Sequence, residues 1–177
     1  MKTAAIALMA LTLSGCAGFE PTPPVALTTA FDAAAFAWST KPGGNTVTGD
    51  ALLRTRGGDV KTCAGLNVTL LPATPYTAEY IWRRFGSEDG GYSGNVDVGP
   101  ITLAPDLDRF RRSGVCDAQG VFTFANLPDG AYYVIATVTW EVPEMAGYYS
   151  YMSLQGGDIA KRVEVKGGET AKLTLTA

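Results

Sequence analysis

The chain has 177 residues, of which 46% are hydrophobic and 18% charged, and its 21 glycines and 10 prolines are typical of one globular domain rich in turns. The formal net charge of -3 argues against a nucleic-acid partner, because a protein that neutralises phosphates carries an excess of lysine and arginine. The sequence contains no histidine, which removes the commonest general base and the commonest metal ligand and predicts a protein that is not an enzyme.

The first residues have the pattern of a secretory signal. Met1 and Lys2 give a charged start, and residues 4–13 form an apolar run that is too short to span a bilayer. The run ends in Leu-Ser-Gly-Cys at positions 13–16, which resembles the lipobox of bacterial lipoproteins. The resemblance implies cleavage after residue 15 and attachment of diacylglycerol to Cys16. The alternative is an ordinary signal peptide with an incidental cysteine.

Lipidation would define the location of the protein. Two or three acyl chains anchor a protein firmly to a membrane without spanning it. Ala17 follows the cysteine at the position where an aspartate would retain a lipoprotein at the inner membrane, so the resemblance implies an outer-membrane lipoprotein. Removal of Lys2 with the signal leaves 13 basic against 17 acidic residues, a formal charge of -4. We therefore expect a mildly acidic protein in the bacterial cell envelope, attached to a membrane.

Residues 16–44 are predicted to form the lipidated N-terminus and a flexible tether. Three prolines at positions 21, 23 and 24 favour an extended conformation over packing. Within this segment, residues 31–38 are rich in alanine and fit either one or two helical turns or an edge strand. The tether would hold the next domain away from the membrane surface.

Short runs with β character follow, separated by Gly-Gly, Pro-Asp-Gly and Lys-Gly-Gly turns. Near the end of the chain, valines and leucines alternate with polar residues, as in strands with one buried face. This rhythm predicts an antiparallel β-sandwich. The expected strands are Thr46 to Arg54, Leu66 to Leu71, Phe110 to Cys116, Val121 to Ala125, Ala131 to Val142, Tyr148 to Leu154, Ile159 to Lys166 and Ala171 to Thr176.

One stretch departs from the β rhythm. Residues 77–85 follow Pro75 and precede Gly86, which is a common residue after the end of a helix, and they predict one short helix. Residues 87–100 are rich in glycine and are expected to form an exposed, mobile excursion.

The segment 117–134 carries a recognisable motif. Residues 117–120 predict a tight turn, Phe122 and Phe124 project to one face, Leu127 caps the core, and Gly130 allows the return into the next strand. The motif resembles the signature of carboxypeptidase-regulatory-like domains, which are related to repeats of bacterial surface adhesins. The resemblance covers residues 45–177 and implies a transthyretin-like, immunoglobulin-like sandwich of about seven strands. Such domains serve as passive spacers, adhesive modules, polymer-binding modules or appendages to enzymes, so the fold leaves the function open.

Two cysteines remain besides Cys16. Cys63 precedes one expected strand and Cys116 ends another, in a compartment where disulfides form. We predict that they pair, because neither a histidine nor a vicinal cysteine is present to activate a thiol.

Two groups of side chains are candidates for a binding surface. Planar rings stack on sugars and on protein partners, and arginines bind phosphates or acidic glycans. Tyr149 and Tyr151 share one face of an expected strand, and Tyr148 and Met152 take the other. The alternatives are packing of the rings in the core and pairing of the arginines with Glu79, Glu88, Asp106 and Asp108. The candidates are Arg83, Arg84, Arg109, Arg111, Arg112, Trp82, Trp140, Tyr149 and Tyr151.

The acidic residues 88, 89, 97, 106 and 108 lie in a loose group without the spacing of an EF-hand. We expect a solvated acidic loop rather than a calcium site or a glycosidase pair, and therefore neither metal nor cofactor. The sequence as a whole favours a non-catalytic envelope lipoprotein that binds or scaffolds a protein or glycan. Two alternatives remain, an accessory subunit or enzyme of envelope polysaccharide or peptide hydrolysis, and a passive spacer.

Overall fold

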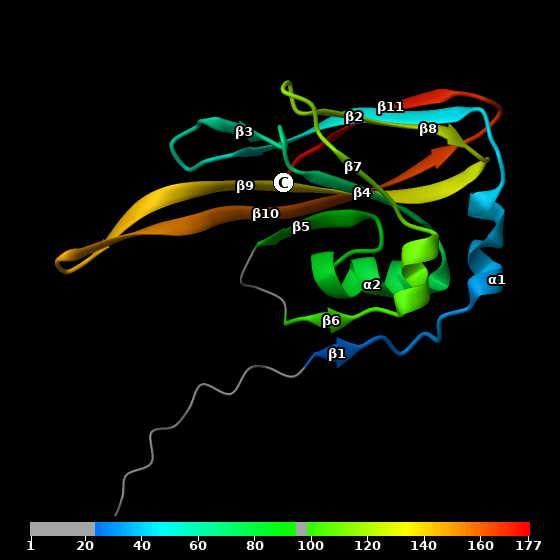
Figure 1. The fold of residues 1–177 in the computed structure, drawn as a ribbon, viewed down its shortest axis with the longest axis horizontal. Helices are drawn as coiled ribbons and strands as arrows, with labels where there is room; N and C mark the ends of the chain where they lie inside the picture. Colours follow the sequence, from blue (N-terminus) through cyan, green and yellow to red (C-terminus); the bar gives the residue numbers. More distant parts are fainter. Residues whose placement is uncertain (1–23, 95–98) are drawn as a thin grey trace, which may run out of the picture.

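The structure is a computed structural model that describes residues 24–94 and 99–177. The predicted signal peptide, the lipidation site Cys16 and Asp97 of the acidic group lie outside the described residues. The described chain forms three layers, which are a small sheet, a five-stranded sheet and a layer of short helices (Figure 1). The predicted fold class, a mainly β protein built as an antiparallel sandwich, is confirmed.

The five-stranded sheet is the central layer, and all its neighbouring strands are antiparallel. Its order is β5 (Gly90–Gly94), β10 (Tyr149–Val165), β9 (Gly130–Ala146), β4 (Asn67–Pro72) and β7 (Arg112–Val115). The small sheet has β2 (Asn45–Arg54) in its middle, with β11 (Thr170–Leu175) parallel on one side and β8 (Val121–Leu127) and β3 (Val60–Thr62) antiparallel on the other.

The main core lies between the two sheets, and the motif at 117–134 contributes to it as predicted. The Asp117 carboxylate accepts hydrogen bonds from the backbone N–H groups of Gln119 and Val121, at 2.9 Å each, and closes the turn before β8. The alternating side chains of β8 that follow, Phe122 and Phe124, are buried between the sheets.

A disulfide joins Cys63 and Cys116, with their Cα atoms 5.7 Å apart, so the predicted pairing is confirmed. Cys63 follows β3 in the small sheet and Cys116 follows β7 in the central sheet, and both side chains belong to the main core. The bridge therefore links the two sheets at one end of the sandwich.

Removal of the disulfide tests its contribution to stability. We expect the Cys63→Ala/Cys116→Ala variant to lose about 2–4 kcal/mol of unfolding free energy, because the bridge restricts a loop of about fifty residues in the unfolded chain. Denaturant unfolding of the variant and of the oxidised wild type measures the difference, with reduced wild type as the control. Equal stability of the three samples would contradict this expectation.

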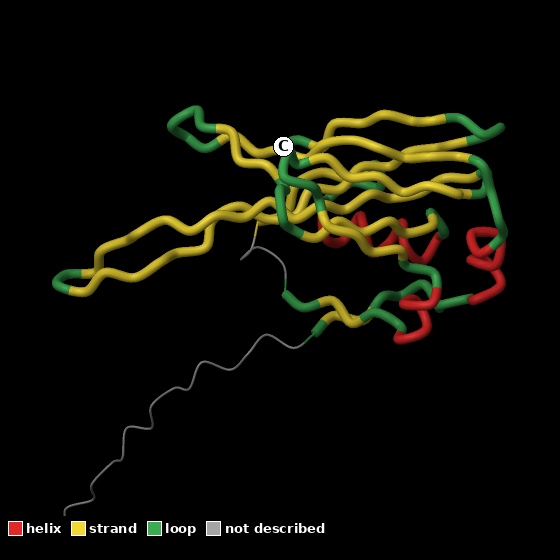
Figure 2. Tube along the Cα trace, turned by 45° about the horizontal axis from the view of Figure 1, so that its top comes forward, coloured by secondary structure: helices red, strands yellow, loops and turns green. Residues whose placement is uncertain are grey.

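A second core lies on the other face of the central sheet, under the helical layer (Figure 2). This layer consists of α2 (Pro75–Phe85), α1 (Ala33–Phe36), the 3-10 helices η1 (Ala37–Thr40) and η2 (Pro105–Arg109), and a short parallel pair of β1 (Val25–Ala26) and β6 (Ile101–Thr102). The predicted helix is α2, which begins two residues earlier than expected because Thr74 and Thr77 form a reciprocal capping box before its first turn.

The tether prediction is wrong for residues 24–44, which pack on the domain. Phe36 is fully buried in the second core, and the open choice for residues 31–38 is resolved in favour of helical turns. Trp38 packs edge-on against Tyr132, with 5.2 Å between ring centroids. Its ring also covers Gly130, where any Cβ would lie 2.2 Å from the indole. The prolines signalled an extended chain, but these long-range contacts decide the structure of the segment.

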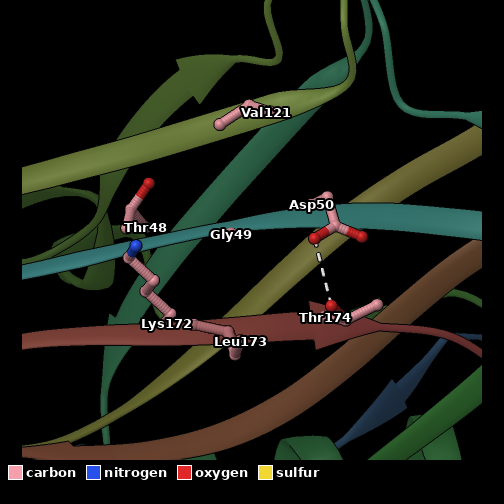
Figure 3. Close-up of a pocket in the computed structure, with 7 residues that line it drawn as sticks. All are labelled: Thr48, Gly49, Asp50, Val121, Lys172, Leu173 and Thr174. Carbon is pink, nitrogen blue, oxygen red and sulfur yellow. Dashed lines mark hydrogen bonds between the residues drawn. The ribbon is translucent and has the colours of Figure 1, made fainter.

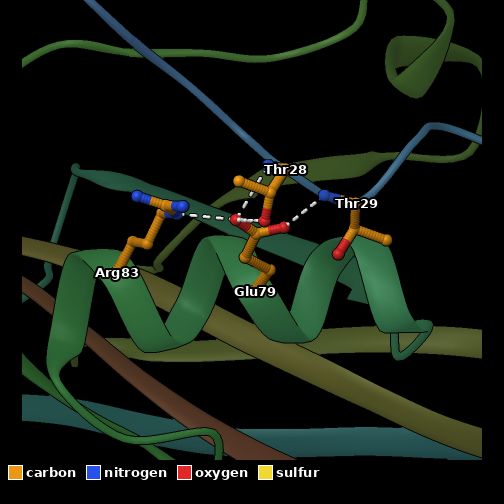
Figure 4. A network of polar contacts seen from close by, with 4 residues as sticks. All are labelled: Thr28, Thr29, Glu79 and Arg83. Atoms are coloured by element: carbon orange, nitrogen blue, oxygen red, sulfur yellow. Dashed lines mark hydrogen bonds and ion pairs between the residues drawn. The ribbon is translucent and has the colours of Figure 1, made fainter.

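Glu79 of α2 fastens the start of this segment (Figure 4). Its carboxylate accepts hydrogen bonds from the backbone N–H groups of Thr28 at 2.9 Å and Thr29 at 2.6 Å, and from the Thr28 hydroxyl at 2.7 Å. Arg83, one helical turn further along α2, donates a fourth at 2.7 Å. The pKa of Glu79 lies far below its usual value of 4.5. The main cause is the hydrogen bond from the Thr28 backbone, and the bonds from Thr29 lower the pKa further.

The depressed pKa of Glu79 predicts a pH dependence of stability. The ionised form contributes stability that is complete above about pH 4.5 and is lost as the pH falls toward the pKa in the folded state. We expect Glu79→Gln to lower the Tm at pH 7 and to reduce the further loss of Tm between pH 5 and pH 3. Thermal unfolding across this range, with Glu164→Gln at an exposed position of β10 as the control, measures the effect. An unchanged pH profile in Glu79→Gln would contradict the assignment.

The structure differs from the predicted strands in one further respect. The three runs expected at 131–142, 148–154 and 159–166 form two strands, β9 and β10, of 17 residues each. They pair from Tyr149 opposite Ala146 to Val165 opposite Gly130, through Gly156 and Gly157 without a turn. The glycine-rich excursion expected at 87–100 is also corrected in part, because Gly90–Gly94 forms β5 on the edge of β10.

Candidate binding surfaces

The distal half of the β9–β10 hairpin projects beyond the rest of the domain (Figure 1). β4 pairs with β9 only as far as Ala136, and β5 pairs with β10 only from Gly157 onward. Within residues 24–94 and 99–177, residues 139–156 therefore form a two-stranded ribbon with which no further strand pairs. Both faces of this ribbon are candidates for contact with a ligand or partner, because the sheet neighbours end before it begins.

One face of the ribbon carries aromatic rings and polar groups. Strand register places Gln155 opposite Trp140 and Tyr151 opposite Glu144, and Tyr149 follows two residues before Tyr151 on the same side. We call these five residues the aromatic face. The structure thus brings together three of the predicted aromatic candidates, and it adds a carboxylate and an amide that the sequence analysis did not single out.

The polar groups of the aromatic face are linked to one another. The Tyr151 hydroxyl donates to the Glu144 carboxylate at 2.8 Å, and the Gln155 amide donates to the same carboxylate at 3.4 Å. The bond to Glu144 raises the pKa of Tyr151 above its usual value, so its hydroxyl stays protonated at neutral pH. These contacts orient the Tyr151 ring before any ligand arrives.

Exposure differs along the aromatic face. Tyr149 is 81% exposed and Tyr151 50% exposed, whereas Trp140 is partly buried at the base, where it packs against the main core. Gly156 has a φ of +90°, and a Cβ there would lie 2.9 Å from the Trp140 ring and 2.1 Å from a backbone oxygen. Glycine is therefore required beneath the indole. The result is a fixed ring at the base and two accessible rings further out.

The other side of the ribbon is the aliphatic face, formed by Pro143, Met145, Met152 and Leu154. Met145, Met152 and Leu154 are each more than half exposed. Met152 lies on the face that points away from Tyr149 and Tyr151, as the sequence predicts. Tyr148 belongs to neither face, because it sits in the turn at the tip and is fully exposed there. The ribbon is thus two-faced, with the aromatic rings of both strands on one side and most of the exposed aliphatic side chains on the other.

Four of the five predicted arginines have close partners within the protein. Arg83 pairs with Glu79 and Arg84 with Asp158, at 2.7 and 2.6 Å. Arg111 pairs with Asp108 at 2.9 Å, and Arg109 approaches Asp106 only to 3.9 Å. Arg112 donates to the backbone carbonyls of residues 125 and 126. Internal partners therefore hold Arg83, Arg84, Arg111 and Arg112, whereas Arg109 is mostly exposed.

Trp82 lies in the helical layer and is 52% exposed. It lines a depression of about 380 Å³ together with Val25, Arg83 and Ile101. The structure therefore separates this candidate from the three rings of the aromatic face.

A further depression of about 440 Å³ lies on the small sheet, lined by residues of β2, β8 and β11 (Figure 3). Its side chains mostly bond to their neighbours: the Thr174 hydroxyl donates to Asp50 at 3.0 Å and the Thr48 hydroxyl donates to the Phe122 carbonyl at 2.9 Å. Among residues 24–94 and 99–177, no group of three potential metal-ligating side chains occurs. No helix of the described chain is long and apolar enough to cross a membrane.

Comparison with known proteins gives a likeness to a solved structure. No protein-family profile matches the chain, and no curated protein is similar to it in sequence. A protein from Pseudomonas aeruginosa, described with its crystal structure as a proposed carbohydrate-binding protein, superposes with a TM-score of 0.68 at 26% sequence identity. The match covers 83% of this chain and 97% of the Pseudomonas protein. The chain is thus similar to a sandwich protein for which sugar binding has been suggested.

Proposed function

We propose that the protein is a non-catalytic lipoprotein of the bacterial cell envelope that binds a glycan through the aromatic face of its hairpin. The observation that carries the proposal is the alignment of Trp140, Tyr149 and Tyr151 on one side of a projecting ribbon, beside Glu144 and Gln155. The likeness to a proposed carbohydrate-binding protein supports it. The resemblance of residues 117–134 to carboxypeptidase-regulatory-like domains, some of which bind polymers, agrees with it.

The arrangement suits a sugar chain. Aromatic rings offer flat apolar surfaces to the C–H faces of sugar rings, and the carboxylate and amide accept and donate hydrogen bonds to hydroxyls. Tyr149 and Tyr151 lie two residues apart on an extended strand, about 7 Å, so they can contact successive parts of one chain. Glu144 is the charged group at the centre of this face, and it disfavours anionic sugars. The expected ligand is therefore a neutral glycan.

The proposed location rests on the lipobox-like residues 13–16 and on the disulfide. Disulfides persist in oxidising compartments such as the periplasm and the cell surface. A lipid on Cys16 would place the domain close to the polysaccharides of the envelope, where a weak surface for sugars gains from proximity. The proposed location would thus bring the aromatic face close to its proposed ligands.

Substitution of the two exposed tyrosines tests the aromatic face. We expect Tyr149→Ala/Tyr151→Ala to weaken glycan binding at least about tenfold, about 1.4 kcal/mol, because the accessible stacking surface is lost while the core is untouched. Affinity electrophoresis in gels containing dextran, pullulan, galactomannan or xyloglucan measures retardation of the protein.

The control for this variant is Met145→Ser/Met152→Ser on the aliphatic face, which we expect to migrate as the wild type does. Retardation of the wild type by none of the four polysaccharides would contradict the proposal. Loss of binding in the methionine variant alone would do so as well, and would direct attention to the aliphatic face.

Substitution of Cys16 tests the anchor. We expect Cys16→Ser to move the protein from the membrane fraction to the soluble periplasmic fraction, because no acyl chain can be attached. Cell fractionation and detergent phase partition of both proteins measure the change, and Cys63→Ala/Cys116→Ala serves as a control that retains Cys16. Continued membrane attachment of the Cys16→Ser protein would overturn the lipoprotein assignment.

A further inference from the structure

The face of the central sheet under the helices is apolar over most of its area, but one row across it is polar. Leu71, Tyr133 and Ala160 fill the second core on this face. Further along the strands, Ser93 of β5 lies opposite Asp158 of β10, which lies opposite Thr137 of β9. Val68 lies opposite Ala136, so Asn67 of β4 continues the same row. We call Ser93, Asp158, Thr137 and Asn67 the polar row.

The polar row borders a cavity of about 200 Å³ at the edge of the helical layer. Asn67, Thr69, Thr137 and Asp158 form its floor, and Tyr80 of α2 and Arg111 lie over it. Apolar walls come from Leu71, Leu103 and Ile135. Six of the nine lining residues thus carry polar groups, so the cavity offers convergent hydrogen-bonding groups beside a smaller aliphatic wall.

The centre of the row is held in place. The Asp158 carboxylate accepts hydrogen bonds from the Thr137 hydroxyl at 2.7 Å and from the Arg84 guanidinium at 2.6 Å, one on each oxygen. Its side chain is only 21% exposed, and that of Arg84 is 26% exposed. Asp158 is therefore oriented by two neighbours and retains lone pairs on both oxygens.

Two buried groups beside Asp158 have hydrogen-bonding capacity that the described residues leave unused. Ser93 is 4% exposed and its hydroxyl has no hydrogen-bond partner, and the Nε atom of the partly exposed Arg84 is also buried without a partner. A buried polar atom without a partner costs free energy, so such atoms are rare in folded proteins. Neither of these two groups lines the cavity, but both are neighbours of Asp158, which does. Burial also raises the pKa of Tyr80, which keeps its hydroxyl protonated as a donor.

The charges of the cavity select a neutral ligand. Asp158 repels an anion at the centre of the floor, while Arg111 on the opposite wall repels a cation. Hydroxyl, amide and carboxylate groups in one row both donate and accept, as the hydroxyls of a sugar do. The volume is below the roughly 300–1,000 Å³ of drug-sized ligand pockets, which limits the occupant to about one ring.

We infer that this cavity is a second carbohydrate site, which takes a single neutral sugar ring on Asn67, Thr137 and Asp158. It lies on the opposite side of the sheet from the aromatic face, so the two sites bind separate sugar units. The inference depends on the proposed function in one respect, which is that the ligand belongs to the class of carbohydrates. A protein with two such sites can bridge two glycan chains.

Protein-observed NMR tests the cavity with defined probes. The Cys16→Ser form of the full chain is titrated with the methyl glycosides of glucose, galactose and mannose, and we expect at least one to shift the amide signals of β4, β9 and β10 around the polar row. Asn67→Ala, at an exposed position, should weaken that glycoside at least about fivefold, as expected for one or two lost hydrogen bonds. Thr69→Phe, which fills the cavity, should abolish the shifts.

The tyrosine variant of the aromatic face separates the two proposals. Tyr149→Ala/Tyr151→Ala should bind the glycoside as the wild type does, because neither residue lines the cavity. Absence of shifts with all three glycosides, shifts confined to residues 139–156, or unchanged affinity in Asn67→Ala would each overturn the cavity site. If polysaccharide retardation persists in Thr69→Phe while glycoside binding fails in the wild type, the cavity site is refuted and the aromatic face stands. Cavity binding without retardation by any polysaccharide refutes only the aromatic face.

Discussion

The register of β9 against β10 is the constraint on which the other features depend. Every one of the 17 residues of β9 has a partner in β10, from the return turn at the tip to the far edge of the domain. Because side chains alternate between faces, a shift of one residue would exchange the two faces of the whole hairpin. The same register thus assigns Val134 to the main core, Tyr133 to the second core and Tyr151 to the aromatic face. One ladder of backbone hydrogen bonds fixes both interiors and both candidate sites.

The helical layer determines which part of the central sheet belongs to the second core and which part borders the cavity. It packs closely on the central sheet near Tyr133 and Ala160 but leaves a cavity over part of the polar row, so the same face is an apolar core at one end and a polar cavity at the other. Its position depends on the segment 24–44, which Glu79 and the buried Phe36 fasten to the domain. The N-terminal segment is therefore part of the structural unit that shapes the cavity.

Local patterns in the sequence predicted the sandwich, the helix and the disulfide, because each depends on neighbouring residues or on compartment chemistry. The turn at Asp117 and the alternation of Phe122 and Phe124 are examples of such local information. The packing of residues 24–44 was missed, since the contacts of Phe36 and Trp38 join segments far apart in the chain. The uninterrupted course of β10 through Gly156 and Gly157 was missed because the local signal was misleading. Two adjacent glycines signal a turn locally, whereas here they allow close approach of Trp140 and β5.

The candidate sites could be predicted only in part. Alternation placed Tyr149 and Tyr151 together, but Glu144 and Gln155 join them through pairing across strands, which no single segment encodes. The polar row has the same origin, with one residue from each of four strands.

A two-stranded ribbon is only marginally stable by itself. The exposed apolar side chains of this ribbon also favour association with other molecules. Trp140 over Gly156 and the Tyr151, Glu144 and Gln155 contacts stabilise the ribbon locally, while the five-stranded sheet holds its base. A projecting element that exposes apolar side chains and is cross-linked by these contacts has the properties of a preformed binding surface.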